Sequence, residues 1–289
     1  MEIPTGLCPV SRVCRPSVYN RHSVFPTAAL PMTTISTLIS TLNSLLAEAG
    51  SAPLNDEELA RFDTCLALLL RWNARTNLTA IREPMVILRR HFLESILAAR
   101  ALPTGIYTLL DFGSGAGFPG LPIAICRPDL AVTLAESQHK KAAYLREAVR
   151  TLGLSVAVHA DRAQSLTCRF DCVTLRAVDR MAEAISAAAR LVAPGGWLAI
   201  LTTTQASHAV FAEVARSASG PVSAAVPERV SGTTAETTVS EAAEARRRQY
   251  KKSGERPEDK SIIQVNWLSP IALPPGTAQL LLLGQPNFA

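Results

Sequence analysis

Short apolar runs alternate with segments of helical length in the C-terminal two thirds of the chain, and this alternation constrains the fold most. The runs are Tyr107–Phe112, Ala131–Ala135, Ser155–Val158, Cys172–Leu175 and Trp197–Leu201. The segments between them, such as Lys140–Leu152 and Arg180–Val192, are long enough for amphipathic helices. Strands that alternate with helices form parallel sheets with helices on both faces. The sequence therefore predicts a mostly parallel, doubly wound α/β fold.

The first hundred residues follow a helical pattern instead. From Thr33 apolar residues recur on one face until Gly50, and a second helix begins at Asn55 with Glu58 as its capping-box partner. A third amphipathic stretch covers Val86–Leu97. These segments predict a small helical cap that precedes the α/β domain.

The same patterns divide the chain. Residues 1–32 lack periodicity and an apolar signal core, so we expect a disordered or non-native extension, with a short transit peptide as the alternative. We assign 33–102 to the cap and 103–289 to the α/β domain. The stretch at about 218–260, rich in Ser, Thr, Ala and Glu, predicts a mobile insertion with a basic end.

The C-terminal part of the α/β domain contains a predicted turn and two further strands. Pro194-Gly195-Gly196 is typical of a turn leading into the fifth strand. The apolar stretches Ile262–Leu268 and Gln279–Leu283 predict two more strands after the insertion.

Composition excludes several classes of protein. The longest apolar runs are far shorter than the roughly 18 residues of a membrane-spanning helix, so we expect no membrane association. The six cysteines contain no CxxC pair, which predicts reduced thiols, no metal site and a cytoplasmic protein, with an organellar matrix as the alternative. The net charge is +5, and residues 246–260 hold seven Lys/Arg and three acids. This basic cluster indicates a polyanionic partner, and a solvated loop is the alternative.

The strongest local motif is Leu-Leu-Asp-Phe-Gly-Ser-Gly-Ala-Gly-Phe-Pro-Gly, residues 109–120, which follows the first predicted strand. Its glycines allow a sharp turn and a close approach to a ligand, and the helix start behind it is expected to offer free N–H groups. Gly115, Gly117 and Gly120 also satisfy the GxGxxG spacing of dinucleotide sites, so NAD binding stays open.

Two acidic residues refine this interpretation. Asp111 stands two residues before Gly113, and the resulting DxGxGxG form favours S-adenosylmethionine over NAD. Glu136 ends the next predicted strand, where a carboxylate accepts hydrogen bonds from ribose hydroxyls in either cofactor class.

Several motifs occur together over about residues 35–200. They are Trp72-Asn73, Asn77-Leu78-Thr79-Ala80-Ile81, His91-Phe92-Leu93-Glu94-Ser95, the loop 111–122, Arg127-Pro128-Asp129-Leu130, Glu136-Ser137, Lys140-Lys141, Phe170-Asp171 and Arg176-Ala177. In this combination the chain resembles the RsmG/GidB family, the 16S rRNA guanine-N7 methyltransferases. The resemblance implies a Rossmann-like fold, S-adenosylmethionine as cofactor and the 16S rRNA of the small ribosomal subunit as partner. The sequence does not give the oligomeric state, and we expect a monomer.

The resemblance also implies site residues. Cofactor contacts map to Gly113, Phe118, Ala163, Gln164 and Arg176, beside Gly115, Gly117 and Glu136 of the nucleoside motif. The candidate RNA contacts are Arg89, Arg90, His91, Lys140, Lys141, Arg246, Arg247, Arg248, Lys251 and Lys252. For Arg176 the alternatives are a cofactor carboxylate, an RNA phosphate and an ordinary surface position, and His91 either contacts RNA or has a structural role.

The implied reaction makes few demands on the protein, because guanine N7 carries an exposed lone pair and loses no proton on methylation. Consistently, residues 174–177 lack the Asp/Asn-Pro-Pro-aromatic motif used on exocyclic amines, and Cys172 lies in an apolar strand that ill suits a nucleophile. Gln164 replaces the acid usual in the family, and Thr202-Thr203-Thr204-Gln205 replaces a Lys-Gly pair. These departures leave two alternatives: a methyltransferase of another RNA or a small molecule, and a non-catalytic cofactor- or RNA-binding relative.

Overall fold

The computed structural model describes residues 32–176, 181–207, 264–274, 277 and 279–287, all within one compact unit, Pro31–Ala289. The extension expected before Met32, the expected insertion at about 218–260 and the basic cluster at 246–260 lie outside the described residues.

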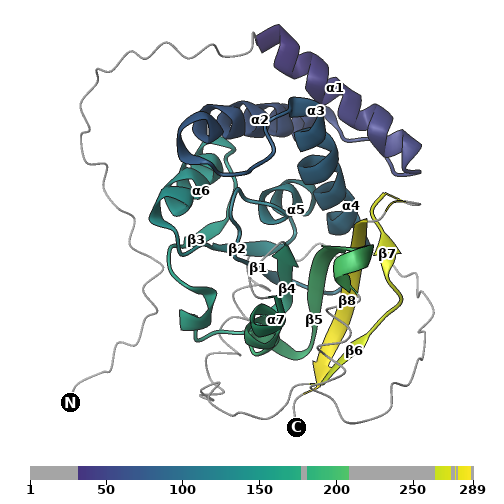
Figure 1. Cartoon of the computed structure of the whole chain (residues 1–289), viewed down its shortest axis with the longest axis vertical. Helices are drawn as coiled ribbons and strands as arrows, with labels where there is room; N and C mark the ends of the chain where they lie inside the picture. The colour runs from purple at the N-terminus through teal and green to yellow at the C-terminus, as the bar shows by residue number, and fades with distance from the viewer. Residues whose placement is uncertain (1–31, 177–180, 208–263, 275–276, 278, 288–289) are drawn as a thin grey trace. The chain divides into compact units, whose positions relative to one another are not determined.

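In the described part of the chain, five helical elements precede the sheet (Figure 1). They are α1 (Met32–Glu48), α2 (Asp56–Thr76), α3 (Pro84–Ile87), the π-helix η1 (Leu88–Leu93) and α4 (Glu94–Ala101). The capping box predicted at the start of α2 is confirmed, since Asn55 Oδ1 accepts from the Glu58 N–H and Glu58 Oε2 accepts from the Asn55 N–H, both at 2.9 Å.

The third predicted helix is continuous but not uniform. The stretch expected over Val86–Leu97 runs from Pro84 to Ala101, and its centre is the π-helical turn η1. A π-turn widens the helix by one residue per turn and redirects the side chains around it, which is why such turns recur at functional sites. The 3.6-residue periodicity that predicted the helix carries no signal for this change.

The sheet confirms the mostly parallel, doubly wound prediction. Its strands are β1 (Thr108–Phe112), β2 (Ala131–Ala135), β3 (Ala157–His159), β4 (Phe170–Arg176), β5 (Val192–Thr203), β6 (Gln264–Trp267), β7 (Ile271–Ala272) and β8 (Gln279–Asn287). The order is β3-β2-β1-β4-β5-β8-β6, with β7 paired to β8. Strands β1 to β5 are parallel, whereas β8 is antiparallel to its neighbours. The strand order reverses between β1 and β4, which is where open α/β sheets bind ligands.

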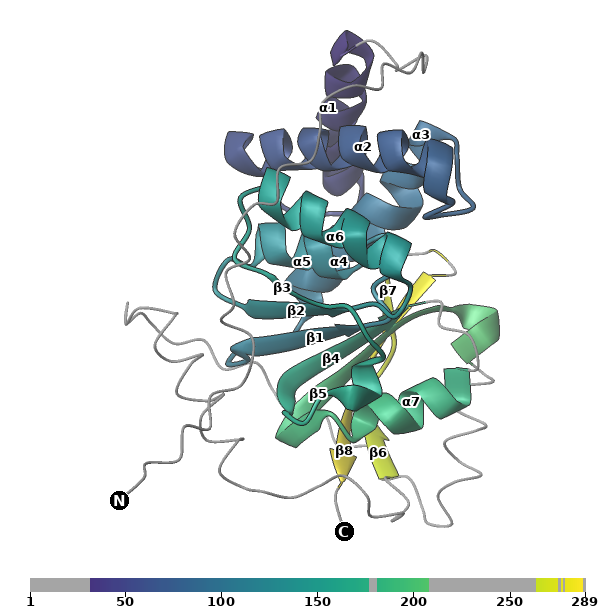
Figure 2. The same ribbon diagram turned by 90° about the vertical axis from the view of Figure 1, so that its left-hand side faces the viewer.

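Helices cover both faces of the sheet (Figure 2). Figure 2 shows α4, α5 (Gly120–Cys126) and α6 (His139–Thr151) on one face and α7 (Met181–Ala189) on the other. Successive residues of β1 point to opposite faces, so buried Leu109 joins the core beneath the cap and buried Leu110 joins the core beneath α7.

Three sequence predictions are wrong in detail. The third strand starts two residues later than Ser155, and the helix expected over Arg180–Val192 ends at Ala189 because Val192 already pairs with β4. The predicted Pro194–Gly196 turn lies inside β5, not before it: Phe170 pairs with Val192 and Cys172 with Trp197, so the intervening residues form a bulge. A Cβ at Gly196 would lie 2.7 Å from the Asp171 carbonyl oxygen, which explains the glycine at this position.

The two predicted C-terminal strands are confirmed as β6 and β8, and the two-residue strand β7 was not predicted. Among the helices that the structure describes, none combines the length and the apolar character needed to cross a membrane.

Candidate functional site

The glycine loop between β1 and α5 is held by backbone hydrogen bonds to the end of β2. The N–H groups of Gly113 and Ser114 both donate to the Ala135 carbonyl, at 3.0 and 2.9 Å, which ties the loop to the end of β2. Gly113, Gly115 and Gly117 all have positive φ, at 75°, 55° and 88°. Side chains rarely adopt these angles, so the three glycines permit the turn.

The three glycines of the GxGxxG spacing serve different purposes. A Cβ at Gly117 would lie 2.4 Å from Leu121 Cδ1, and one at Gly120 would lie 2.6 Å from Asp111 Oδ2, so both are required by packing inside the protein. A Cβ at Gly115 would meet no atom closer than 3.9 Å. Gly115 is therefore the glycine of this set whose backbone borders open space.

The helix start behind the loop does not offer the free N–H groups that the sequence suggested. The Gly120 N–H donates to Asp111 Oδ2 at 3.1 Å, and the Leu121 N–H donates to the Gly117 carbonyl at 2.8 Å. Residue 122 is a proline and has no N–H to donate. This expectation is corrected: the N-terminus of α5 is satisfied within the protein.

Asp111 accounts for part of that correction. Its carboxylate is 1% exposed and also accepts from the Thr174 hydroxyl at 2.9 Å, so it joins β1, β4 and the start of α5. Burial raises the pKa of Asp111 to about 6, against the opposing effect of these hydrogen bonds. The acid that shaped the cofactor prediction is thus a structural residue.

Glu136 lies directly after β2 and faces the loop. Its Oε2 accepts from the Gly115 N–H at 2.9 Å and its Oε1 accepts from the Gln138 N–H at 2.7 Å. Each carboxylate oxygen has two lone pairs, so both retain capacity for one more donor. Glu136 therefore stands beside the part of the loop where Gly115 borders open space.

The π-turn brings His91 onto the loop. The imidazole ring stacks on the Phe118 ring with centroids 4.8 Å apart and an angle of 17° between the planes. Nε2 lies 2.9 Å from the Thr79 hydroxyl. Burial lowers the pKa of His91 to about 3, helped by the positive charges of Arg176 and Arg90, so the ring is neutral at physiological pH.

Thr79 is itself positioned by Asn73, a motif residue to which the sequence assigned no function. The buried side chain of Asn73 accepts from the Thr79 N–H at 3.0 Å. The Asn73, Thr79 and His91 side chains thus form a path from α2 to the Phe118 ring. The sequence could have indicated this connection, because all three residues lie in motifs of the family.

Arg176, at the end of β4, is not an ordinary surface arginine. Its guanidinium forms an ion pair with Glu94 at 2.6 Å and donates to the Ser95 hydroxyl at 3.3 Å and to the Arg90 carbonyl. Arg90 also pairs with Glu94, at 3.1 Å. Burial raises the pKa of Glu94 to about 7, although both arginines oppose that rise. Glu94 has no separate role in the sequence analysis, because its partner Arg176 lies far along the chain.

The parallel sheet brings most predicted cofactor residues to one edge. Gly113, Gly115, Phe118, Glu136 and Arg176 follow or end β1, β2 and β4, whose carboxyl ends meet at the point where the strand order reverses. Two further predicted residues lie after β3 in the 3₁₀ turn η2 (Ala163–Ser165): Ala163 is buried and Gln164 is exposed.

The basic candidates divide into three groups. Arg89 and Arg90 are exposed on η1, and Lys140 is exposed and Lys141 half-buried at the start of α6. The candidates at 246–252 lie outside the described residues.

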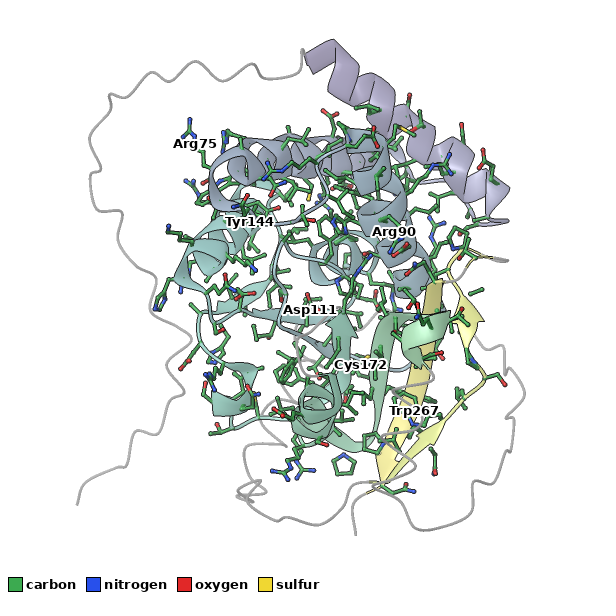
Figure 3. The ribbon with its side chains drawn as sticks, viewed as in Figure 1. Arg75, Arg90, Asp111, Tyr144, Cys172 and Trp267 are labelled. Carbon is green, nitrogen blue, oxygen red and sulfur yellow. The ribbon has the colours of Figure 1, made fainter. Side chains whose placement is uncertain are left out.

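Cys172 is fully buried in β4, and burial raises the pKa of its thiol, which supports a structural role (Figure 3).

Away from the glycine loop, the described part of the chain contains a hollow but no metal site. No group of three or more His, Cys, Asp or Glu side chains there could hold a metal ion. A hollow of about 380 Å³ lies away from the glycine loop, between α2 and α6, and is lined by Arg71, Trp72, Arg75, Thr76 and Glu147.

Comparison with known proteins gives consistent results. A family model described as rRNA small subunit methyltransferase G matches residues 58–231. Ribosomal RNA small subunit methyltransferase G of Stenotrophomonas maltophilia strain K279a is 44% identical over 172 residues, which cover 58% of this chain and 77% of that protein. The protein of the same name from Xanthomonas euvesicatoria pv. vesicatoria strain 85-10 is 46% identical over 136 residues, covering 46% and 63%.

Among solved structures, a ribosomal protein L11 methylase from Lactobacillus delbrueckii subsp. bulgaricus is 9% identical and covers 68% of this chain and 77% of its own, with a TM-score of 0.43. This structural similarity is too weak to assign a family, so the family is assigned from the sequence comparisons. The family model spans more than half of the chain and includes every described residue of the candidate cofactor site. The chain therefore belongs to the rRNA small subunit methyltransferase G family, as its motifs had indicated.

Proposed function

We propose that this protein is an S-adenosylmethionine-dependent methyltransferase that modifies N7 of a guanine in the 16S rRNA of the small ribosomal subunit. The observation that carries the proposal is the hydrogen bond from the Gly115 N–H to Glu136, at the reversal point of the strand order. It sets an open stretch of backbone beside a carboxylate, as a nucleoside site requires. Family membership favours S-adenosylmethionine over NAD as the nucleoside.

The residues present fit this cofactor. Glu136 has acceptor capacity for the two ribose hydroxyls on the side of the loop where Gly115 has no close neighbour. Gly113 and Gly117 hold the turn, and Phe118 is fixed between the rings of His91 and Phe92. We assign the adenine end to Ala163 and Gln164, because they follow β3, the neighbour of the strand that delivers Glu136.

S-adenosylmethionine supplies a methyl group on a positively charged sulfur, and guanine N7 takes that methyl with its lone pair while the sulfur keeps the electrons of the broken bond. No proton leaves the guanine, so the protein needs no general base. Neutral His91 agrees with this requirement: it acts on the site through its stacking contact with Phe118. The chain's task is to align the two reactants and to exclude water.

Arg176 is proposed to contact the cofactor carboxylate. Its guanidinium is held by Glu94 and Ser95 of the cap, so it is already ordered at the end of β4. A preordered guanidinium loses little side-chain entropy when an anion binds. Arg89, Arg90, Lys140 and Lys141 are proposed to contact RNA phosphates beside this site, together with the basic residues at 246–252.

The remaining expectations complete the proposal. We propose a monomeric cytoplasmic protein that needs no metal, with the cap at 33–102 and the α/β domain at 103–289. The division into cap and α/β domain is one of sequence pattern, and the contacts of Arg176 and His91 cross it.

The test is methyl transfer to small ribosomal subunits purified from cells that lack this gene. Incubation with radiolabelled S-adenosylmethionine should label 16S rRNA at one guanine, and borohydride–aniline cleavage should map the label to N7. Methylation at an exocyclic amine or a ring carbon would refute the N7 assignment.

The alternatives predict other results in the same assay. A methyltransferase of another RNA or a small molecule leaves the subunits unlabelled but labels a cell extract. A non-catalytic relative binds S-adenosylmethionine in calorimetry and transfers no methyl group. A nicotinamide enzyme binds NAD in place of S-adenosylmethionine.

A further inference from the structure

The hollow between α2 and α6 is not used by the proposed cofactor site, and side-chain contacts join the two helices that form its walls. Glu147 of α6 accepts from the Arg71 guanidinium and, at 3.1 Å, from Trp72 Nε1. The Trp72 ring packs edge-on against the buried Tyr144 ring, with centroids 5.8 Å apart. These contacts connect the helices on both sides of the hollow.

The two helices that border the hollow carry five exposed basic residues. We call them the α2–α6 basic surface: Arg71 and Arg75, which line the hollow, and Lys140, Arg146 and Arg150 along α6. Glu147 is the single acid in α6 and the last six residues of α2, and Arg71 and Trp72 already bind it. Figure 3 shows Arg75 at the outer side of α2, above Tyr144.

The basic surface leads to the candidate cofactor site. Lys140 lies at the start of α6, four residues after Glu136, and Arg150 lies near the other end of the helix. Ten residues of α-helix cover about 15 Å. A nucleic acid strand on this surface would therefore contact several basic side chains in succession and end beside the glycine loop. The hollow, at about 380 Å³, lies within the size range of roughly 300–1,000 Å³ typical of small-ligand sites.

We infer that the α2–α6 basic surface binds the phosphodiester backbone of the RNA substrate, with one phosphate held in the hollow by Arg75 and Arg71. This inference rests on the proposed function and adds an RNA-binding surface along α2 and α6. The partner is a single RNA strand, because guanidinium groups match phosphate geometry and a backbone contact needs no base sequence. Arg71 keeps its bond to Glu147 and supplies a second donor, and both arginines are exposed residues of the lining of the hollow.

The test compares two single substitutions on the same helix in the full chain. Arg75→Gln removes the proposed phosphate contact, and Arg61→Gln is the matched control: it removes a partly exposed arginine of α2 whose ion pair with the exposed Glu57 adds little stability. Binding of oligouridylate and of unmodified small subunits is measured by titration over a range of salt concentrations. S-adenosylmethionine affinity is measured separately by calorimetry.

Loss of one phosphate contact to a single strand should make the slope of log K against log salt less steep by about 0.7, which is roughly a fivefold weaker affinity at about 0.1 M salt. Arg75→Gln should show this change with both RNAs, with a raised KM for subunits, an unchanged kcat and an unchanged affinity for S-adenosylmethionine. Arg146→Gln, on the α6 side of the surface, should behave similarly. Arg61→Gln should leave all of these quantities at their wild-type values.

The inference is overturned if Arg75→Gln and Arg146→Gln match Arg61→Gln in affinity and salt slope, or if they change S-adenosylmethionine binding instead. The two proposals fail separately. If the wild-type protein methylates 16S rRNA and the variants bind RNA normally, the surface assignment is wrong. If no ribosomal RNA is methylated and Arg75→Gln still weakens RNA binding, the surface stands and the proposed function is wrong.

Discussion

Replacing Glu94 by glutamine tests whether burial or the ion pairs with Arg176 and Arg90 dominate the energetics of this carboxyl group. Burial raises the pKa of Glu94 to about 7 from 4.5, despite the ion pairs with Arg176 and Arg90. The folded protein therefore binds the proton more tightly than the unfolded chain, and the Glu94 carboxyl makes its full contribution to stability below about pH 4.5. That contribution is lost as the pH rises towards 7. The neutral amide of the Glu94→Gln variant would resemble the protonated acid at every pH.

The expected size follows from the two pKa values. A difference of about 2.5, at about 1.4 kcal/mol per pH unit, gives about 3 kcal/mol. The free energy of unfolding of the wild type, relative to that of Glu94→Gln, should therefore fall by about 3 kcal/mol between pH 4.5 and 7.5. The side chain of Glu94 is only 5% exposed, so screening by solvent should reduce this little.

The assay is urea unfolding of both proteins at several pH values, followed by circular dichroism. Glu94→Ala is the companion variant: unlike glutamine, alanine removes the acceptor of the Arg176 guanidinium, and the buried donor left unsatisfied should cost about 1–3 kcal/mol at neutral pH. A wild-type stability that rises relative to Glu94→Gln over the same pH range would refute the reasoning, because the ion pairs would then outweigh burial.

Other predictions concern the loop and the ring that covers it. Gly117→Ala should destabilise the protein by about 2–5 kcal/mol in urea unfolding, because its Cβ would meet Leu121 at 2.4 Å and its φ of 88° is strained for a side chain. Gly115→Ala has room for the methyl group, so it should lower S-adenosylmethionine affinity in calorimetry and cost only the roughly 1–2 kcal/mol of its positive φ. For His91, with a pKa lowered to about 3 from 6.5, the wild type should lose stability relative to His91→Phe as the pH falls below 6.5, by about 1.4 kcal/mol per pH unit in the same unfolding assay. A constant difference would show that His91 takes up its proton without cost in the folded protein.

Periodicity predicted the sheet well because it reflects local burial. The five parallel strands and both C-terminal strands have apolar runs that are visible without any tertiary contact. The errors occur where pairing sets the limits. Val192 pairs with Phe170 across the bulge at Pro194–Gly196, so β5 begins before a sequence that reads as a turn. The strand β7 has two residues, too few for a pattern.

The site was predictable only where a residue acts through the local backbone. The glycine turn and Glu136 follow directly from motif spacing, and the structure places them in contact. The roles of Asp111 and Arg176 depend on partners 63 and 82 residues away. No local pattern indicates such a pairing, so Asp111 read as a cofactor signal although its carboxylate is used to join β1, β4 and α5.

The cap is an integral part of the candidate site. Phe118 and Arg176, two of the proposed cofactor contacts, are both held by side chains of the helices before the sheet: His91 and Phe92 pack on the Phe118 ring, and Glu94 binds the Arg176 guanidinium. His91, Phe92 and Glu94 lie within four residues of one another, at the π-turn and the start of α4. A displacement of that short segment would therefore release both contacts at once, because a single helical turn supports the loop after β1 and the end of β4 together. The glycine motif forms the turn, but the helices before it determine whether the residues around that turn are ready to bind.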